Sequence, residues 1–491
     1  MDRRVIKDLT GRAWYHQRFD GSPFYLFFIG EAEVRQERRK PPGTEADVRV
    51  CFFEDGKADW YLDLSDVRRG SEAVIRLAKR DPNISKKLLA RWQRDEMRFQ
   101  DFFDRFAAIH LGGLSDTNLL KLYGTYAMAG INRFTSSSII DHFALGTDEH
   151  IARMLREEVG ALRSESQFTE IFSAATAPVH QSFINAAEME LLKIAIAKAK
   201  SLDALAAYQQ RYFWISNNYR DANVLAVEHF KKEVDLWRTS KKDLTAQYRQ
   251  LQHTARNNAK KKAALFRQYT FSPLLKTLLK ISEDFTWWQD ERKKATFLNI
   301  HLGTQILGEM ARRIGLDREL TKFLVPGEVA LWFRHGEPSV RDLTRRQVSS
   351  GFVCSRNGYT VAVGRDGDRL RRAMFPKKQA DVVRDIRGLA ASVGRVIGRV
   401  KVVGSVKEIG KVETGDILVA VMTRPDYIAG IKKAAALVTN EGGITCHAAI
   451  ISRELGIPCI IGTKIATEVF HDGDLVEVNA NHGVVTLLER V

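Results

Sequence analysis

Residues 439–463 read Thr439-Asn-Glu-Gly-Gly-Ile-Thr-Cys-His-Ala-Ala-Ile-Ile-Ser-Arg-Glu-Leu-Gly-Ile-Pro-Cys-Ile-Ile-Gly-Thr463. Gly442 and Gly443 predict a turn whose backbone can approach a ligand closely, because glycine has no side chain in the way. Thr445 is a good N-cap, and residues 447–455 have the pattern of a short helix that the following glycine ends. The histidine at position 447 therefore lies in the first turn of the predicted helix.

The position of His447 gives its imidazole a particular chemistry. The free N–H groups and the positive end of a helix disfavour an imidazolium in the first turn and favour a bound phosphate. A neutral imidazole beside an anion site is what a phosphoryl-accepting nucleophile requires. A lone histidine at this position can also be a capped, half-buried core residue. The surrounding residues therefore have to distinguish a nucleophile from a core residue. The neighbouring Cys446 is either a second nucleophile or a small filler.

Residues 442–458 closely resemble the phosphohistidine swivelling domain of the PEP-utilising enzymes, through the string Gly-Gly-x-Thr-Cys-His-Ala-Ala-Ile-x-x-Arg-Glu-Leu-Gly-Ile-Pro. In that family the histidine of this motif is phosphorylated, and it aligns with His447. The resemblance further implies that the phosphate loop is supported by Gly442, Gly443, Thr445 and Cys446.

The same resemblance extends to residues outside the loop. The segment Thr423-Arg-Pro-Asp426 matches a Thr-x-Pro-Asp pattern of the family and implies that Thr423, Arg424 and Asp426 support the domain. Arg453 lies six residues along the predicted helix. We therefore expect it to fix the domain through an ion pair with a neighbour rather than to bind phosphate directly.

The order of hydrophobic patterns predicts a multidomain chain. It has a mainly α-helical N-terminal and central body with a small β-containing start, and it ends in a C-terminal α/β swivelling phosphohistidine domain. We predict a mixed α/β segment at residues 1–66 and a helical body at 67–333 that binds an acceptor or a partner. A β-containing arm and hinge linker at 334–393 and the phosphohistidine domain at 394–491 follow.

Several short segments have strand or hinge patterns. Residues 24–30 are a strand candidate, and residues 47–53 and 58–64 predict a hairpin around an Asp-Gly turn. Residues 351–363 predict a second β-rich patch. Residues 388–394 are small and flanked by glycines, which favours a hinge and is also compatible with an ordinary linker.

The charge of the chain is concentrated outside its C-terminal domain. The 491 residues carry 76 basic and 60 acidic side chains, a formal net charge of +16. Residues 391–491 hold 11 of each sign, so the whole excess lies in residues 1–390. A basic body suits an anionic ligand, an acidic partner surface or nucleic acid, and charge alone does not choose among them.

Residues 229–268 supply much of this excess and predict one long polar helix. It is either a solvated helix or hairpin arm, or a docking surface. Nucleic-acid binding is disfavoured, because few aromatic residues are interleaved and no nucleic-acid-binding fold signature accompanies the helix.

The cysteines argue against a zinc-binding protein, and the hydropathy argues against a membrane-spanning or secreted one. The four cysteines form no Cys-x-x-Cys pair and have no zinc-ligand spacing, so we expect no metal site on this chain. No apolar run approaches the ~18 residues of a membrane span, and the N-terminus lacks the apolar core of a signal peptide. The cytoplasm is the expected location.

The family resemblance also bears on the phosphoryl donor. Residues 290–294 and 308–329 resemble, more weakly, the helical segment before the swivelling domain in PEP synthase and rifampicin phosphotransferase. Within it Arg292, Arg312 and Arg313 are candidates to contact an anion, or ordinary salt-bridged surface.

Residues 1–390 show no ATP-grasp pattern, and no PEP-binding barrel follows the histidine domain. We expect one subunit of a split phosphotransferase, with ATP and Mg²⁺ on a separate ATP-grasp subunit and a small-molecule acceptor. The alternative is a non-catalytic docking or regulatory protein that retains the mobile domain.

Overall fold

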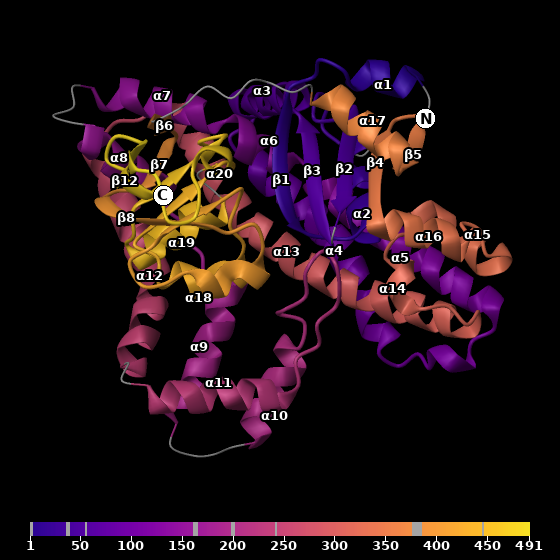
Figure 1. Cartoon of the computed structure of the whole chain (residues 1–491). Helices are drawn as coiled ribbons and strands as arrows, with labels where there is room; N and C mark the ends of the chain where they lie inside the picture. Colours follow the sequence, from indigo (N-terminus) through magenta and orange to yellow (C-terminus); the bar gives the residue numbers. More distant parts are fainter. Residues whose placement is uncertain are drawn as a thin grey trace. The chain divides into compact units, whose positions relative to one another are not determined.

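Figure 1 shows the computed structural model of the chain. The structure describes residues 3–491 with the exception of 36–39, 55, 161–164, 198–201, 241–242, 376–384 and 444–445. The described chain forms two compact units. The first comprises residues 1–147, 218–221 and 299–384, and the second comprises residues 148–217, 222–298 and 385–491.

The first unit is built on a five-stranded antiparallel sheet with the strand order β1-β3-β2-β4-β5. Its strands are β1 (Trp14–Asp20), β2 (Val48–Glu54), β3 (Lys57–Asp63), β4 (Ser349–Ser355) and β5 (Gly358–Val363). The predicted β2–β3 hairpin is confirmed, and so are the two strands of the later β-rich patch. The sequence did not indicate that β2 and β4, about 300 residues apart, pair along their whole length.

Helix α2 (Pro23–Val34) corrects the prediction of a strand at residues 24–30. Pro23 occupies the first helical turn, where its missing N–H costs nothing, and Ser22 precedes it in an extended conformation. Nearly every residue of the helix is buried. A short run that is apolar on all sides has no period, so the pattern could not distinguish a buried helix from a buried strand.

Most other elements of the first unit are helices, and its core lies between them and the sheet. They are α1 (Arg3–Leu9), α3 (Leu64–Arg80), α4 (Ile84–Phe106), α5 (Asp116–Ser137), α6 (Ile139–Gly146), α14 (Arg318–Thr321), α15 (Val329–His335), α16 (Val340–Val348) and α17 (Arg365–Met374).

The helices of the second unit include the basic stretch. They are α7 (Asp148–Val159), α8 (Glu165–Thr176), α9 (Phe183–Ile196), α10 (Leu202–Tyr212), α11 (Val227–Thr239), α12 (Leu244–Gln268) and the first part of α13 (Pro273–Arg313). The single helix predicted at 229–268 is wrong, because α11 ends before Ser240, whose backbone is extended, and Asp243 caps α12. No helix in the described part of the chain combines the length and hydropathy needed to cross a bilayer.

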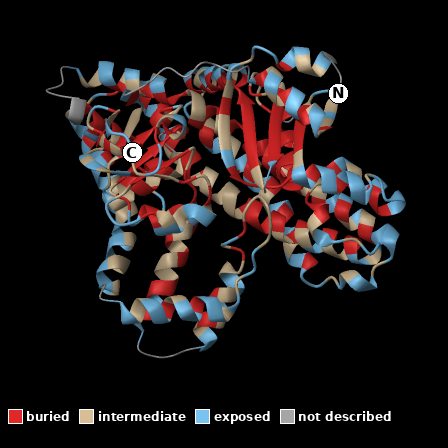
Figure 2. Cartoon of the chain, viewed as in Figure 1, coloured by how far each residue is buried: buried red, intermediate tan, exposed pale blue. Residues whose placement is uncertain are grey.

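The second unit also contains an eight-stranded mixed sheet of order β6-β13-β12-β8-β9-β10-β11-β7. Its strands are β6 (Asp385–Arg387), β7 (Leu389–Ser392), β8 (Arg395–Val402), β9 (Ile417–Ala420), β10 (Ala436–Thr439), β11 (Cys459–Ile461), β12 (Leu475–Asn479) and β13 (Val484–Glu489). Buried residues are concentrated in the strands of both sheets, whereas α11 and α12 expose their outer faces (Figure 2). The expected fold class, a mostly helical chain with a β-containing start and a C-terminal α/β region, is confirmed.

The hinge predicted at residues 388–394 is instead part of this sheet. Strands β6 and β7 are the two edges of the sheet, and only Gly388 separates them in the chain, so the sheet curls until its edges meet. A side chain at Gly388 would come within 2.5 Å of the Ile461 carbonyl oxygen. The C-terminal sheet therefore begins at Asp385 rather than at the predicted residue 394, and small residues serve close packing here.

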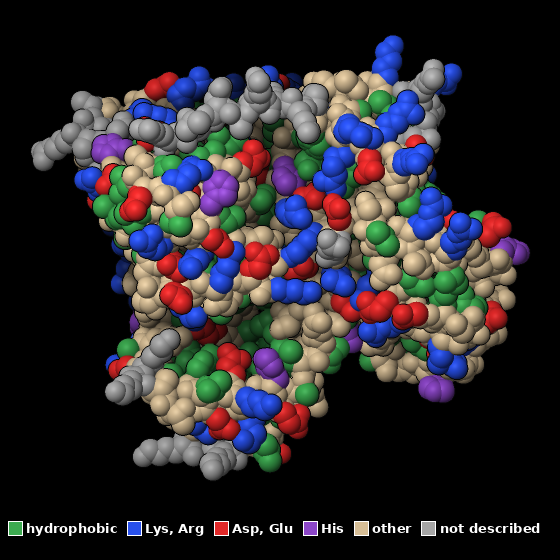
Figure 3. Space-filling view, viewed as in Figure 1, with side chains coloured by type: hydrophobic (Ala, Val, Ile, Leu, Met, Phe, Trp, Pro, Cys, Tyr) green, Lys and Arg blue, Asp and Glu red, His purple; other side chains and the backbone are tan. Residues whose placement is uncertain are grey.

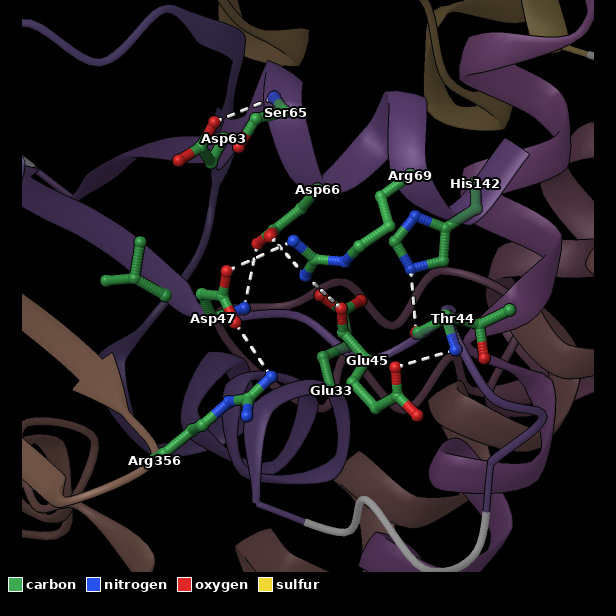
Figure 4. Close-up of polar contacts among 12 residues, drawn as sticks. Glu33, Thr44, Glu45, Asp47, Asp63, Ser65, Asp66, Arg69, His142 and Arg356 are labelled. Atoms are coloured by element: carbon green, nitrogen blue, oxygen red, sulfur yellow. Dashed lines mark hydrogen bonds and ion pairs between the residues drawn. The ribbon is translucent and has the colours of Figure 1, made fainter. Parts of the chain in front are cut away.

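A buried ion network joins α2, β2 and α3 in the first unit. The Arg49 guanidinium is only 2% exposed and donates to Glu33 and, at 3.2 Å, to Asp66. Asp66 also accepts from Arg69 at 2.7 Å (Figure 4). Burial is the main influence on these groups and raises the pKa of both Glu33 and Asp66. Arg49, which lies between the two carboxylates, stabilises the charges of both, and Arg69 adds to this at Asp66.

Replacing Arg49 with methionine should lower the free energy of unfolding by about 3–5 kcal/mol, because it removes the ion pair of the buried Glu33 and one of the two cations that contact Asp66. Arg356→Ala is the matched control, because Arg356 pairs with Asp47 at the surface and should cost under about 1 kcal/mol. Urea unfolding followed by circular dichroism measures both values. Equal losses in the two variants would contradict the role given to Arg49.

Candidate functional site

The histidine of the glycine-rich loop begins helix α19 (His447–Leu455), as the sequence predicts. The N-cap is Cys446, whose Sγ accepts from the Ala449 N–H at 3.5 Å. The predicted cap, Thr445, lies outside the described residues. Gly456 ends the helix in the left-handed conformation, with a φ of 69°. His447 is thus the first residue of a capped helix of two and a half turns.

The loop before the helix requires glycine for two reasons. Gly442 has a φ of 128°, and a Cβ there would lie 2.8 Å from the Cys446 sulfur. The carbonyl of Gly443 accepts from the Cys446 N–H at 2.9 Å. The predicted turn therefore packs against the cap of α19, and the two glycines hold the start of the helix in place.

The ring of His447 is oriented by Thr423. The Thr423 hydroxyl lies 3.0 Å from Nδ1 of His447, and Thr423 itself is 3% exposed. This contact leaves Nε2 as the ring nitrogen for a reaction. Burial, and then the charges of Lys293 and Arg424, hold the pKa of His447 well below its usual value. The imidazole is neutral at pH 7, as the sequence predicts, but packing and two cations contribute to this besides the helix end.

The remaining predicted support residues have different positions. Arg424 is buried and acts electrostatically on His447, whereas Asp426 is exposed. Arg453 donates from Nε to the Ala391 carbonyl at 2.8 Å and so ties α19 to the edge strand β7. That contact links parts of one domain, and the ion pair expected from the sequence stays a prediction.

Cys446 is a poor second nucleophile. Burial is the largest influence on its thiol and raises its pKa to about 11. A thiol attacks as the thiolate, which is scarce at neutral pH when the pKa is this high. The structure therefore favours a capping role for the Cys446 side chain.

A cavity of about 950 Å³, including its open mouth, adjoins His447 within the second unit. It is formed by the segment leading into α9, by α9 itself, α13, α18 (Ile428–Ile431) and α19. The histidine is therefore accessible from a space large enough for a small molecule. The residues that line the cavity are Pro178, Val179, His180, Gln181, Ser182, Ile184, Asn185, Glu188, Glu283, Thr286, Trp287, Gln289, Asp290, Lys293, Ile428, His447, Ile450, Ile451 and Glu454.

Two residues of this cavity have unusual acid–base properties, and the sequence analysis gave neither a role. Burial raises the pKa of Asp290 to about 7, although its carboxylate accepts from the Phe183 N–H at 2.7 Å. Burial, followed by the charge of Arg424, lowers the pKa of Lys293 to about 7. Among the described residues, the Lys293 ammonium makes no hydrogen bond or ion pair. The two residues are three positions apart, which places both on one face of α13. This spacing was the feature of the sequence from which the pair could have been predicted.

The arginines proposed from the weaker resemblance do not gather at the cavity. Arg312 pairs with Glu309, and Arg313 pairs with Glu309 and Asp116 in the first unit. These two arginines form ordinary surface ion pairs. Arg292 does not line the cavity, although it follows Asp290 on the same helix.

One group of residues near the cavity has the composition of a cation site. His180, Glu283 and Asp284 offer ligand atoms that lie within 4.8 Å of one another. The carboxylates are already paired, Glu283 with Lys262 and Asp284 with Lys280, each at 2.9 Å. We assign no metal to this group, because a cation would have to displace two ammonium groups.

Replacing Lys293 with methionine should raise the pKa of His447 towards 6.5, because it removes one of the two cations that oppose the imidazolium. NMR titration of selectively ¹³C-labelled histidine, assigned with His447→Gln, measures this pKa. Lys294→Met is the control, since Lys294 faces Glu291 at 3.6 Å and does not line the cavity. A pKa that changes equally in both variants would contradict the assigned geometry.

Comparison with known proteins agrees with this site. Residues 412–483 match the family model of the PEP-utilising enzyme, mobile domain. The chain is 58% identical over 173 residues to a probable phosphoenolpyruvate synthase of Archaeoglobus fulgidus, an alignment that covers 35% of this chain and 22% of the relative. It is 52% identical over 108 residues to the phosphoenolpyruvate synthase of Pyrococcus furiosus, covering 22% and 13%.

A solution NMR structure of a UPF0107 protein is 19% identical, with a TM-score of 0.18, and the match covers 21% of this chain and 99% of that one. The two phosphoenolpyruvate synthases are much longer than this chain, which spans less than a quarter of the length of these curated relatives. The C-terminal part of the chain is a mobile domain of the PEP-utilising enzymes, and the chain is partly homologous to PEP synthases.

Proposed function

We propose that His447 is transiently phosphorylated and passes its phosphoryl group to a small molecule held in the adjoining cavity. The observation that carries this proposal is the shared lining of that cavity by His447, Asp290 and Lys293. A neutral nucleophile, a carboxylate and a cation at one wall are the groups that phosphoryl transfer to a hydroxyl requires.

The second half of the reaction can be written with these residues. A hydroxyl of the acceptor attacks phosphorus while the N–P bond to Nε2 breaks and its electron pair returns to the imidazole. Asp290 takes the hydroxyl proton, and its raised pKa makes it a useful base near neutrality. Lys293 and Arg424 lie where they neutralise the charge of the transferring group. The Thr423 hydroxyl holds the ring so that Nε2 faces the reaction.

The donor belongs to the first half of the reaction. We propose ATP, or PEP, with ATP and Mg²⁺ bound by a separate ATP-grasp subunit. Helix α12 offers a docking surface for an acidic face of that partner. It has no acidic residue, and Arg249, Arg256, Lys260 and Arg267 recur on one exposed side at spacings of seven, four and seven.

Two other functions are less well supported. A docking or regulatory protein has no need of a neutral histidine beside a base and a cation in a cavity. A nucleic-acid surface would extend basic residues beyond the one side of α12. On the face shown in Figure 3, red acidic side chains are interspersed among the blue basic ones.

Incubation with [³²P]PEP, or with [γ-³²P]ATP and a candidate ATP-grasp partner, should label the protein on His447. The label should be acid-labile and should be lost in His447→Asn. The control Cys446→Ser should keep it, because a serine hydroxyl also caps α19 and the thiol takes no part. Labelling of His447→Asn, or no label from any donor, would overturn the proposed function.

Transfer from the phosphorylated protein to an acceptor should have a bell-shaped pH profile centred near pH 7. The rate rises with pH as Asp290 loses its proton and falls as Lys293 loses its own, and both groups titrate about 7. Single-turnover rates between pH 5 and 9 measure the profile. Asp290→Asn should flatten the acidic limb and Lys293→Met the alkaline limb, whereas Lys294→Met, outside the cavity lining, should change neither.

A further inference from the structure

The cavity beside His447 has an apolar middle and two charged ends. These features indicate the chemical class of the acceptor. Its apolar lining comes from both the helical part and the mobile domain: Pro178, Val179, Ile184, Trp287, Ile428, Ile450 and Ile451. An apolar wall of this extent favours a ligand with a hydrocarbon or aromatic body. It does not suit a ligand that is polar throughout.

Helix α19 fixes the distance between the two ends. His447, Ile450, Ile451 and Glu454 all line the cavity, and their spacings of three, four and seven place them on one face of the helix. Seven residues of helix span about 10 Å. His447 and Glu454 are therefore about 10 Å apart along the axis of α19, with two isoleucines between them.

The far end of the cavity is negative. Glu454 accepts from the neutral Asn185 amide at 3.0 Å, and Glu188 lies close enough to raise its pKa further after burial. Lys432 pairs with Glu188 at 2.9 Å and compensates one of the two carboxylates. Glu188 and Glu454 line this end, and Glu233, outside the lining, lies near enough to Glu188 for their charges to interact.

Resting on the proposed function, we infer that the acceptor is an alcohol with an apolar body and a cationic amine about 10 Å from the reacting hydroxyl. The hydroxyl meets the phosphoryl group on His447, the body contacts Ile450 and Ile451, and the ammonium pairs with Glu454. A small carboxylate such as pyruvate is excluded from this end by like charge and is too short to contact the apolar wall.

Binding of a matched series tests the inference without any phosphoryl transfer. The probes are 8-amino-1-octanol, 1,8-octanediol and 8-hydroxyoctanoate, which share one chain and one hydroxyl and differ in the charge of the other end. Isothermal titration calorimetry should show the amine bound at least about tenfold more tightly than the carboxylate, with the diol between them. Pyruvate should show no binding.

The variants locate the preference. Glu454→Gln should reduce the preference for the amine below about threefold, and Glu188→Gln should do the same, because it removes the second carboxylate that lines this end. Glu468→Gln, on the exposed side of α20 (Ala466–Val469), should leave it unchanged. Circular dichroism checks the fold of each variant, and Glu188→Gln keeps the test open should Glu454→Gln fail to fold.

Equal binding of the amine and the carboxylate, an unchanged preference in a folded Glu454→Gln, or no binding of any member of the series would overturn the inference. His447→Asn separates it from the proposed function, because this variant takes no phosphoryl group yet should still prefer the amine to the carboxylate. A wild-type protein that is never labelled but prefers the amine would refute only phosphotransfer. A wild-type protein that is labelled on His447 but shows no preference for the amine would refute only the acceptor class.

Discussion

The hydrogen bond between the Thr423 hydroxyl and Nδ1 of His447 is the contact on which the site depends. It ties the loop after β9 to the first residue of α19 and fixes the direction of the imidazole. Because one ring nitrogen is engaged by a buried hydroxyl, the other is left for chemistry. The neutrality of the ring comes from a second source, the burial and two cations that oppose its protonation.

The fold explains why Thr423 and His447 are held within hydrogen-bonding distance. The C-terminal sheet curls until β6 and β7, separated only by Gly388, form its two edges. Arg453 then ties α19 to β7, and Cys446 caps the helix over the glycine turn. The helix that carries His447 is thus held at its beginning by the loop and along its length by an edge strand. A nucleophile on such a support is positioned by backbone contacts rather than by a flexible side chain.

The cavity combines groups whose protonation states oppose one another. Burial favours the neutral acid of Asp290 and the neutral amine of Lys293. It therefore raises the pKa of Asp290 and lowers the pKa of Lys293, each to about 7. The cost of desolvating these charges is tolerated at a site where a base and a phosphate-binding cation are useful. By contrast, the buried charges of the ion network around Arg49 in the first unit are paired with one another.

The sequence alone determined the helix that begins at His447, the glycine turn before it and the hairpin of β2 and β3, and its resemblance to a known family indicated the mobile domain. The helix, the turn and the hairpin depend on neighbours within a few residues, where capping, glycine conformation and alternation leave a clear pattern. Only the tertiary structure decided that residues 24–30 are helical, that 388–394 includes a sheet edge, and that β2 pairs with β4. It also decided the pKa values of Asp290 and Lys293, because these come from burial against residues distant in sequence. The sequence shows how far apart residues are along the chain. Desolvation and the pairing of distant strands arise only once the chain has folded.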